Sequence, residues 1–147
     1  MNRYYRSKFQ LISSQDNKEL SIRNTLLTQA AIMDNTDLNN FNNKTPQVLV
    51  VDDEKILRLV LRRSLTKEGY KVIEASNGEQ CLNICDQKLP DIVLLDARMP
   101  IIDGFTCCAQ LKDNFASQCP PILMITGLHD EESVERAFEA GATDYIT

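Results

Sequence analysis

Strand-sized apolar segments alternate with helix-like segments from Gln47 to the end of the 147-residue chain. The runs "QVLVV", "DIVLLD" and "PPILMIT" are apolar almost throughout, which is typical of strands that are buried on both faces. The stretches between them repeat apolar residues at helical spacing, and Gly69 and Gly141 end two of these stretches. This alternation predicts βαβ units, and therefore an α/β fold in which helices cover both faces of a doubly wound parallel sheet.

The expected elements follow from these patterns. Strands are expected at 47–51, 70–75, 91–96 and 120–126, with the start of a last strand at 143–147. Helices are expected at 54–68, 77–85, 103–115 and 130–141, and Asn77 is expected to cap the second of them.

The first 46 residues form a separate region in this prediction. The Asn-rich stretch "DNTDLNNFNNKTP" before Gln47 is typical of a linker. The stretch 20–33 has apolar residues near helical spacing, so a short amphipathic helix that docks on a partner is one interpretation. The alternative is a marginal helix in an N-terminal arm, because isolated short helices are weak. We expect residues 1–46 to be an N-terminal extension and residues 47–147 to form the domain.

Composition argues against several classes of function. The net charge of −5 and the pI of about 4.9 argue against direct contact with nucleic acid or an anionic membrane. The apolar runs are too short to span a bilayer and no signal peptide is recognisable, so a cytoplasmic location is expected. The five cysteines include no CxxC pair and are expected to be reduced, partly buried thiols. His129, the only histidine, lies beside Asp130 and is expected at the surface rather than in a zinc site.

Acidic residues stand where the expected strands end. Asp52 and Asp53 close the first strand, Asp96 closes the third, and Thr126 closes the fourth. Because ligands of parallel α/β sheets bind at the carboxyl ends of the strands, these side chains are expected to converge. A divalent cation would offset the repulsion between the carboxylates, and oxygen ligands without Cys or His point to Mg²⁺. The alternative is that the acids only cap the following helices. Capping would readily explain one such acid, but it explains three acids at strand ends less well.

Four motifs then carry a resemblance to a known family: "VLVVDDE", "DIVLLDARMPIIDGF", "ILMITG" and "AGATDYIT". In this order and spacing they resemble the receiver domain of two-component response regulators, over about residues 47–147. The resemblance implies a flavodoxin-like fold with strand order 2-1-3-4-5. It also implies Mg²⁺-dependent transfer of a phosphoryl group from a histidine kinase or phosphotransfer protein to an aspartate. Such a domain is a phosphoacceptor switch rather than an enzyme with a turnover substrate.

The resemblance assigns the phosphoacceptor and the metal ligands by position. Asp96 would accept the phosphoryl group. Asp53 and Asp96, with the backbone carbonyl of Arg98, would bind Mg²⁺ directly, and Asp52 would hold the ion more through water.

It also assigns a switch and a loop. Thr126 would form a hydrogen bond with a phosphoryl oxygen, and Tyr145 would be the aromatic residue whose ring turns inward with it. The loop after the phosphoacceptor matches the family at Met99, Pro100 and Gly104.

The chain departs from the family pattern at its end. The family carries a lysine directly after the stretch that matches "DYIT", and then a final helix, and neither follows Thr147 here. We therefore expect a C-terminally truncated receiver, as in a fragment of a longer protein. The alternative is that the 20–33 stretch packs in the place of the last helix. Lys55 stands next to the acidic pair but begins a helix, so it is not expected to replace the lysine.

Two other functional classes compete with the phosphoacceptor. A receiver-like interaction module that is not phosphorylated is the alternative that the absent lysine favours. A Mg²⁺-dependent phosphatase of the aspartyl-phosphate type would need a second acid two residues after the nucleophile. This chain has Arg98 at that position, which argues against a phosphatase.

The output is expected beyond this chain. The stretch 124–147 resembles receivers attached to diguanylate cyclase domains, so that output is the first expectation, ahead of a histidine-kinase-linked or DNA-binding one. The expected signalling surface is the 130–141 helix with the last strand, including Tyr145. A homodimer through this surface is left open, since the final helix that would complete the surface is absent.

Overall fold

The structure of the protein is a computed structural model that describes residues 45–125 and 131–146. The helix expected at 20–33 lies outside these ranges, as do Thr126, His129 and Thr147. Of the linker, only its last two residues are described.

Five parallel strands form one sheet in the order β2-β1-β3-β4-β5. The strands are β1 (Gln47–Val51), β2 (Lys71–Ala75), β3 (Ile92–Asp96), β4 (Ile122–Ile125) and β5 (Asp144–Ile146). The helices are α4 (Lys55–Lys67), α5 (Gly78–Gln87), α6 (Gly104–Phe115) and α7 (Glu131–Glu139), and a short 3-10 turn, η1, spans Ala116–Gln118. The α/β fold and the strand order are thus confirmed, with element ends within one or two residues of those expected.

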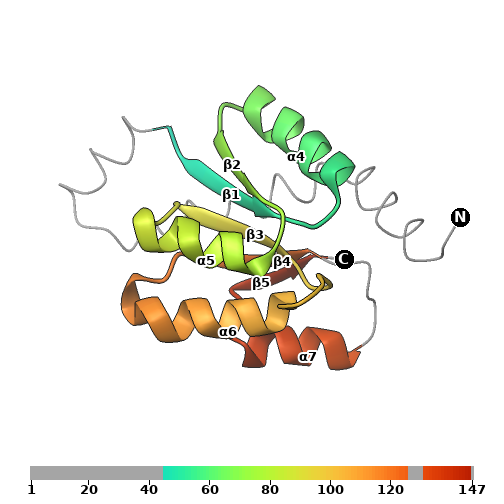
Figure 1. The fold of residues 1–147 in the computed structure, drawn as a ribbon, viewed down its shortest axis with the longest axis vertical. Helices are drawn as coiled ribbons and strands as arrows, with labels where there is room; N and C mark the ends of the chain where they lie inside the picture. Colours follow the sequence, from blue (N-terminus) through green and yellow to red (C-terminus); the bar gives the residue numbers. More distant parts are fainter. Residues whose placement is uncertain (1–44, 126–130, 147) are drawn as a thin grey trace, which may run out of the picture.

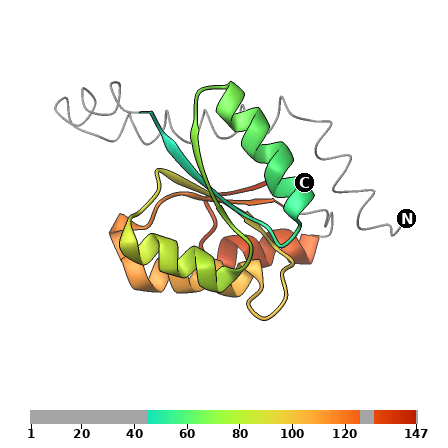
Figure 2. The ribbon, with the colours of Figure 1, turned by 45° about the horizontal axis from the view of Figure 1, so that its top comes forward.

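The described helices lie on the two sides of the sheet, with α5, α6 and α7 on one face and α4 on the other (Figure 1, Figure 2). Side chains alternate along the strands accordingly. Leu49 and Leu95 join the cluster beneath α5, α6 and α7, whereas Val50 and Leu94 join the cluster that includes Leu65 of α4. Because β1, β3 and β4 are buried along their whole length, their sequences are apolar runs instead of alternating patterns.

Polar caps and a glycine fix the helix ends. The side chain of Asn77 accepts a 2.9 Å hydrogen bond from the Gln80 N–H at the start of α5, so the predicted cap is present. Asp103 accepts a 2.7 Å bond from the Thr106 N–H at the start of α6. Each such cap contributes about 1 kcal/mol. Gly69, at a φ of 91°, ends α4 in a conformation that residues with side chains rarely adopt.

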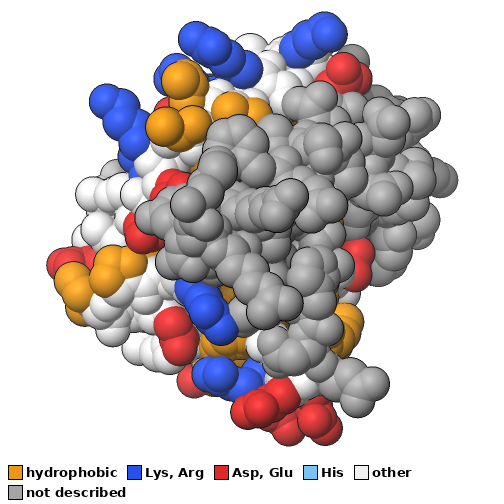
Figure 3. Space-filling model, turned by 90° about the vertical axis from the view of Figure 1, so that its right-hand side faces the viewer, with side chains coloured by type: hydrophobic (Ala, Val, Ile, Leu, Met, Phe, Trp, Pro, Cys, Tyr) orange, Lys and Arg blue, Asp and Glu red, His pale blue; other side chains and the backbone are white. Residues whose placement is uncertain are grey.

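Charge is unevenly distributed between α4 and α7. The sequence of α4 has no acidic residue and carries five basic ones: Lys55, Arg58, Arg62, Arg63 and Lys67. The sequence of α7 is rich in glutamate and has Arg136 as its basic residue. In Figure 3, Lys and Arg side chains gather at the top, where α4 lies, and acidic side chains gather at the lower edge, where α7 lies. Among the described helices, none is long and apolar enough to cross a membrane.

Candidate functional site

Three carboxylates lie together at the carboxyl ends of β1 and β3. Because these strands pair in parallel, with Val51 opposite Leu95, the residues that end them reach the same edge of the sheet. The side chains of Asp52, Asp53 and Asp96 each place a carboxylate oxygen within 4.8 Å of the other two. The structure therefore brings these three sequence-predicted residues into one cluster, hereafter the acidic cluster.

Asp52 is fixed by its backbone and by its side chain. Its Oδ1 accepts a 2.8 Å hydrogen bond from the Glu54 N–H, and its carbonyl oxygen accepts a 2.7 Å bond from Nη1 of Arg58. The N-cap residue of α4 is Glu54, whose own side chain makes no capping bond. A capping role thus accounts for one oxygen of Asp52, but it does not account for the convergence of three acids.

Burial within the acidic cluster is graded. Asp96 is 2% exposed and Asp52 is 6% exposed, whereas Asp53 is open to solvent. Like charges held this close and partly withdrawn from water repel, and a divalent cation relieves that repulsion. Carboxylate oxygens are the ligands of a hard ion, and the exposed side at Asp53 leaves room for the waters that Mg²⁺ retains. The donor set therefore fits Mg²⁺.

The loop after Asp96 is drawn back onto the strand end by a glycine. The Gly104 N–H donates a 2.9 Å hydrogen bond to the carbonyl oxygen of Ala97. A Cβ at position 104 would lie 2.8 Å from the Cα of Ala97 and would overlap the carbonyl oxygen of Asp96. Only a residue without a side chain fits this contact. The close approach of the two backbone segments therefore explains why the predicted loop has glycine at position 104.

The rest of this loop projects into solvent from a buried anchor. Met99 is 7% exposed and packs in the core, whereas its neighbours Arg98 and Pro100 are exposed. Ile101 has a φ of 71° and is 99% exposed. A β-branched residue rarely adopts that left-handed conformation, so the tip of the loop is strained.

Of the two predicted switch residues, the structure describes Tyr145 but not Thr126. Thr126 directly follows β4 and lies outside the described residues; Ile125, which ends β4, is the register partner of Asp96. Tyr145 lies in β5 opposite Met124, two strands away from β3. Its side chain is partly buried and packs against the cluster beneath α5, α6 and α7.

Sequence reasoning missed Arg58. Its side chain is 15% exposed and lies 3.7 Å from Glu74, which also pairs with Arg62 at 3.4 Å. These three residues border a surface pocket of about 320 Å³ between α4 and β2. The only signal in the sequence is the position of Arg58 in the first turn after the acidic pair.

The cysteines lie in the core and take no part in the acidic cluster. All five are free thiols, and four of them are buried. A hydrogen bond with Cys107 raises the pKa of Cys81, and one with Cys81 lowers the pKa of Cys85. Burial raises the pKa of Cys108 to about 12 and also raises the pKa of Cys119.

Comparisons with known proteins agree with the motifs. Residues 48–147 match the family model of the response regulator receiver domain. The response regulator PleD of Caulobacter vibrioides is 40% identical over 101 residues, which are 69% of this chain and 22% of that protein. A probable transcriptional regulator, ycf27, of Guillardia theta is 40% identical over 100 residues, which are 68% of this chain and 38% of that protein. The chain therefore spans less than half the length of these curated relatives.

Solved structures share the fold. The chemotaxis protein CheY4 of Vibrio cholerae superposes with a TM-score of 0.67 at 27% identity, covering 71% of this chain and 87% of that one. A putative response regulator from Chloroflexus aurantiacus superposes with a TM-score of 0.66 at 36% identity, covering 69% and 84% of the two chains. With the family model matching most of its length, the chain belongs to the response regulator receiver domain family.

Proposed function

We propose that Asp96 accepts a phosphoryl group from the phosphohistidine of a histidine kinase or phosphotransfer protein, and that this event switches a signalling surface. The observation that carries the proposal is the acidic cluster of Asp52, Asp53 and Asp96 at the carboxyl ends of neighbouring strands, in a chain of the receiver family. Carboxylates gathered at this edge suit both a cation and a phosphoryl transfer that the cation assists.

The acceptor chemistry needs little from the protein besides position. A carboxylate is ionised at neutral pH, so Asp96 needs no general base to act as a nucleophile. One carboxylate oxygen forms a bond to phosphorus while the bond between phosphorus and the donor imidazole nitrogen breaks. The electron pair stays on that nitrogen, which takes a proton from solvent, and Asp96 becomes an acyl phosphate.

The acidic cluster would hold Mg²⁺ for this step. The proposed ligands are Asp52, Asp53, Asp96 and the backbone carbonyl of Arg98. When bound, the ion neutralises negative charge on the transferred group and on its acceptor. The hydrogen bond from Arg58 holds the backbone of Asp52 in place, so that part of the site is organised in advance.

The proposed switch consists of Thr126 and Tyr145. Thr126 would form a hydrogen bond with a phosphoryl oxygen, and Tyr145 would change its ring position in response. The added charge would bias a two-state segment, as in other phosphorylation switches. The proposed signalling surface is α7 with β5.

An output domain or partner would read this surface. The resemblance of residues 124–147 to receivers linked to diguanylate cyclases supports a cyclase output. Relatives such as ycf27 and AfsQ1 are named as transcriptional regulators, which supports a DNA-binding output as the second candidate.

Intact mass after incubation with acetyl phosphate and Mg²⁺ tests the proposal. We expect the gain of one phosphoryl group, and we expect its loss in Asp96→Asn and in the presence of EDTA. Asp113→Asn, at an exposed position on α6, is the matched control and keeps the gain. No gain in folded protein would contradict the phosphoacceptor role and favour an interaction module that is not phosphorylated.

A further inference from the structure

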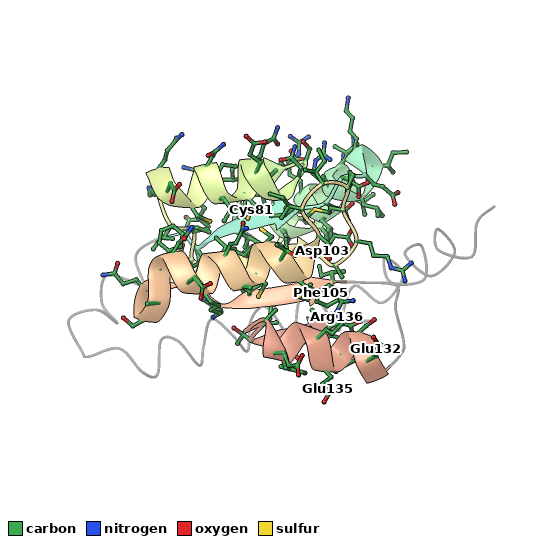
Figure 4. The ribbon with its side chains drawn as sticks, turned by 60° about the horizontal axis from the view of Figure 1, so that its bottom comes forward. Cys81, Asp103, Phe105, Glu132, Glu135 and Arg136 are labelled. Carbon is green, nitrogen blue, oxygen red and sulfur yellow. The ribbon has the colours of Figure 1, made fainter. Side chains whose placement is uncertain are left out.

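Arg136 of α7 reaches across to the start of α6. Its guanidinium carbon lies 4.3 Å from the centre of the Phe105 ring, and its Nη2 lies 3.9 Å from Oδ2 of Asp103. Figure 4 shows the three side chains together where α6 faces α7. One arginine thus makes an ion pair and a cation–π contact with two residues of the neighbouring helix start.

The residues that Arg136 contacts are also tied to the acidic cluster. Asp103 caps α6, and Phe105 is buried in its first turn. Between them stands Gly104, which is bonded to Ala97 and touches the backbone of Asp96. Residues 103–105 therefore contact α7 on one side and the strand end that carries Asp96 on the other.

A second carboxylate is within reach of the same arginine. Glu132 precedes Arg136 by four residues on α7, the spacing at which side chains on a helix meet. Figure 4 shows Glu132 and Arg136 near each other on this helix. The side chains of Arg136 and Asp103 are 50% and 40% exposed, so water and salt screen their attraction. Because this ion pair is weak, Arg136 can change its partner between Asp103 and Glu132.

We propose that Arg136 is a positioning residue that couples α7 to the acidic cluster. In one state it holds Asp103 and Phe105 and so fixes the loop 97–103; in the other it pairs with Glu132 and releases Asp103 and Phe105, while Ala137 keeps α7 packed in the core. The inference rests on the proposed function, because this loop would supply the Arg98 carbonyl to Mg²⁺. Coupling is reciprocal, so the contact strengthens ion binding and ion binding strengthens the contact.

The direction in which Arg136→Gln changes the affinity for Mg²⁺ separates this coupling from a simple charge effect. Arg136→Gln removes a positive charge from the domain, and electrostatics alone would then make Mg²⁺ bind more tightly. Loss of positioning makes Mg²⁺ bind more weakly instead. Arg136→Lys keeps the charge but loses the planar group that stacks on Phe105, so it is expected to weaken binding without a change in net charge.

The experiment is an Mg²⁺ titration followed by the amide NMR signals of Gly104, near the site, and of Ala140 and Ala142, next to the end of α7. In the unmodified chain we expect both sets of signals to shift with a single dissociation constant. In Arg136→Gln we expect a dissociation constant about two- to five-fold higher and loss of the shifts at Ala140 and Ala142. Glu132→Gln removes the competing carboxylate and is expected to leave binding as tight or tighter.

Arg63→Gln, an exposed substitution on α4, is the matched control and is expected to leave both sets of signals unchanged. Equal or tighter Mg²⁺ binding in Arg136→Gln, with the shifts near α7 retained, would overturn the coupling alone. An unmodified chain that responds to Mg²⁺ no more than Asp96→Asn does would overturn the metal site of the proposed function as well. The two failures are therefore distinguishable.

Discussion

The guanidinium of Arg58 donates a 2.7 Å hydrogen bond to the backbone carbonyl of Asp52. This bond joins the first turn of α4 to the residue that follows β1. The Arg58 side chain is 15% exposed, so the bond is largely shielded from competing water. A basic residue on a helix thus helps to fix the backbone position of an acidic residue of the acidic cluster.

Arg58→Gln is expected to destabilise the domain. Loss of a partly buried, charge-assisted hydrogen bond costs about 1–3 kcal/mol. The matched control is Arg62→Gln, which removes a pair with Glu74 at a side chain that is 48% exposed, and this is expected to cost less than about 1 kcal/mol. Urea unfolding followed by circular dichroism measures both. Equal losses would show that the shared pair with Glu74, and not the bond to Asp52, accounts for the effect.

Gly104→Ala is expected to be poorly tolerated. The new methyl group would meet the backbone of Asp96 and Ala97, which cannot move without displacing the end of β3. Such overpacking costs about 1–3 kcal/mol, and we expect weaker Mg²⁺ binding with it. Gly78→Ala is the comparison, because its methyl group would lie 2.9 Å from Cγ2 and 3.0 Å from Cβ of Ile102, a milder overlap than the one with backbone atoms at position 104. A smaller loss for Gly104→Ala than for Gly78→Ala in urea unfolding would contradict this reading of the loop.

The fold could be predicted from the sequence because the strand patterns and the helix patterns both point to the same α/β arrangement. Strands buried on both faces leave apolar runs, and the helices between them keep one apolar side. Asn77 could be predicted as a cap because the bond from Gln80 is local. The strand order came from the family resemblance, since periodicity alone does not fix which strands are neighbours.

The side-chain contacts around the acidic cluster could not be predicted in this way. Convergence of Asp52, Asp53 and Asp96 follows from topology, because parallel strands end at one edge. The bond from Arg58 and the reach of Arg136 to Asp103 depend on rotamers and on the distance between α6 and α7. Neither has a sequence period, and an arginine on an exposed helix face is usually only a solvated charge.

Asn77→Ala is expected to weaken the start of α5. The Asn77 side chain accepts the Gln80 N–H at 2.9 Å, and loss of such a cap costs about 1 kcal/mol. Asn83→Ala, at an exposed interior position of the same helix, is the control and is expected to be neutral or slightly stabilising, because alanine is the better helix former. Hydrogen exchange of the Gln80 and Cys81 amides would localise the effect. Unchanged exchange at both amides in Asn77→Ala would exclude the cap as a source of stability.

Stability is expected to fall as the pH rises above the ordinary range of thiol ionisation. Burial raises the pKa of Cys108 from 9.0 to about 12, so the folded chain keeps a proton that the unfolded chain releases. The stabilisation is therefore complete below about pH 9 and is lost as the pH approaches about 12. The pKa of Cys81 is raised as well, mainly by its hydrogen bond with Cys107, and acts in the same direction, whereas the pKa of Cys85 is lowered by its hydrogen bond with Cys81 and acts in the opposite direction.

Cys108→Ala isolates this contribution. The substitution lowers stability at every pH, because it leaves a small cavity, but it should make the decline with pH less steep. The measurement is the free energy of unfolding in urea at several pH values between about 8 and 10, compared as slopes and not as single values. All other titratable groups are common to both proteins, so their effect cancels in the difference between the slopes. Parallel slopes would mean that the Cys108 thiol ionises as readily in the folded chain as in the unfolded one.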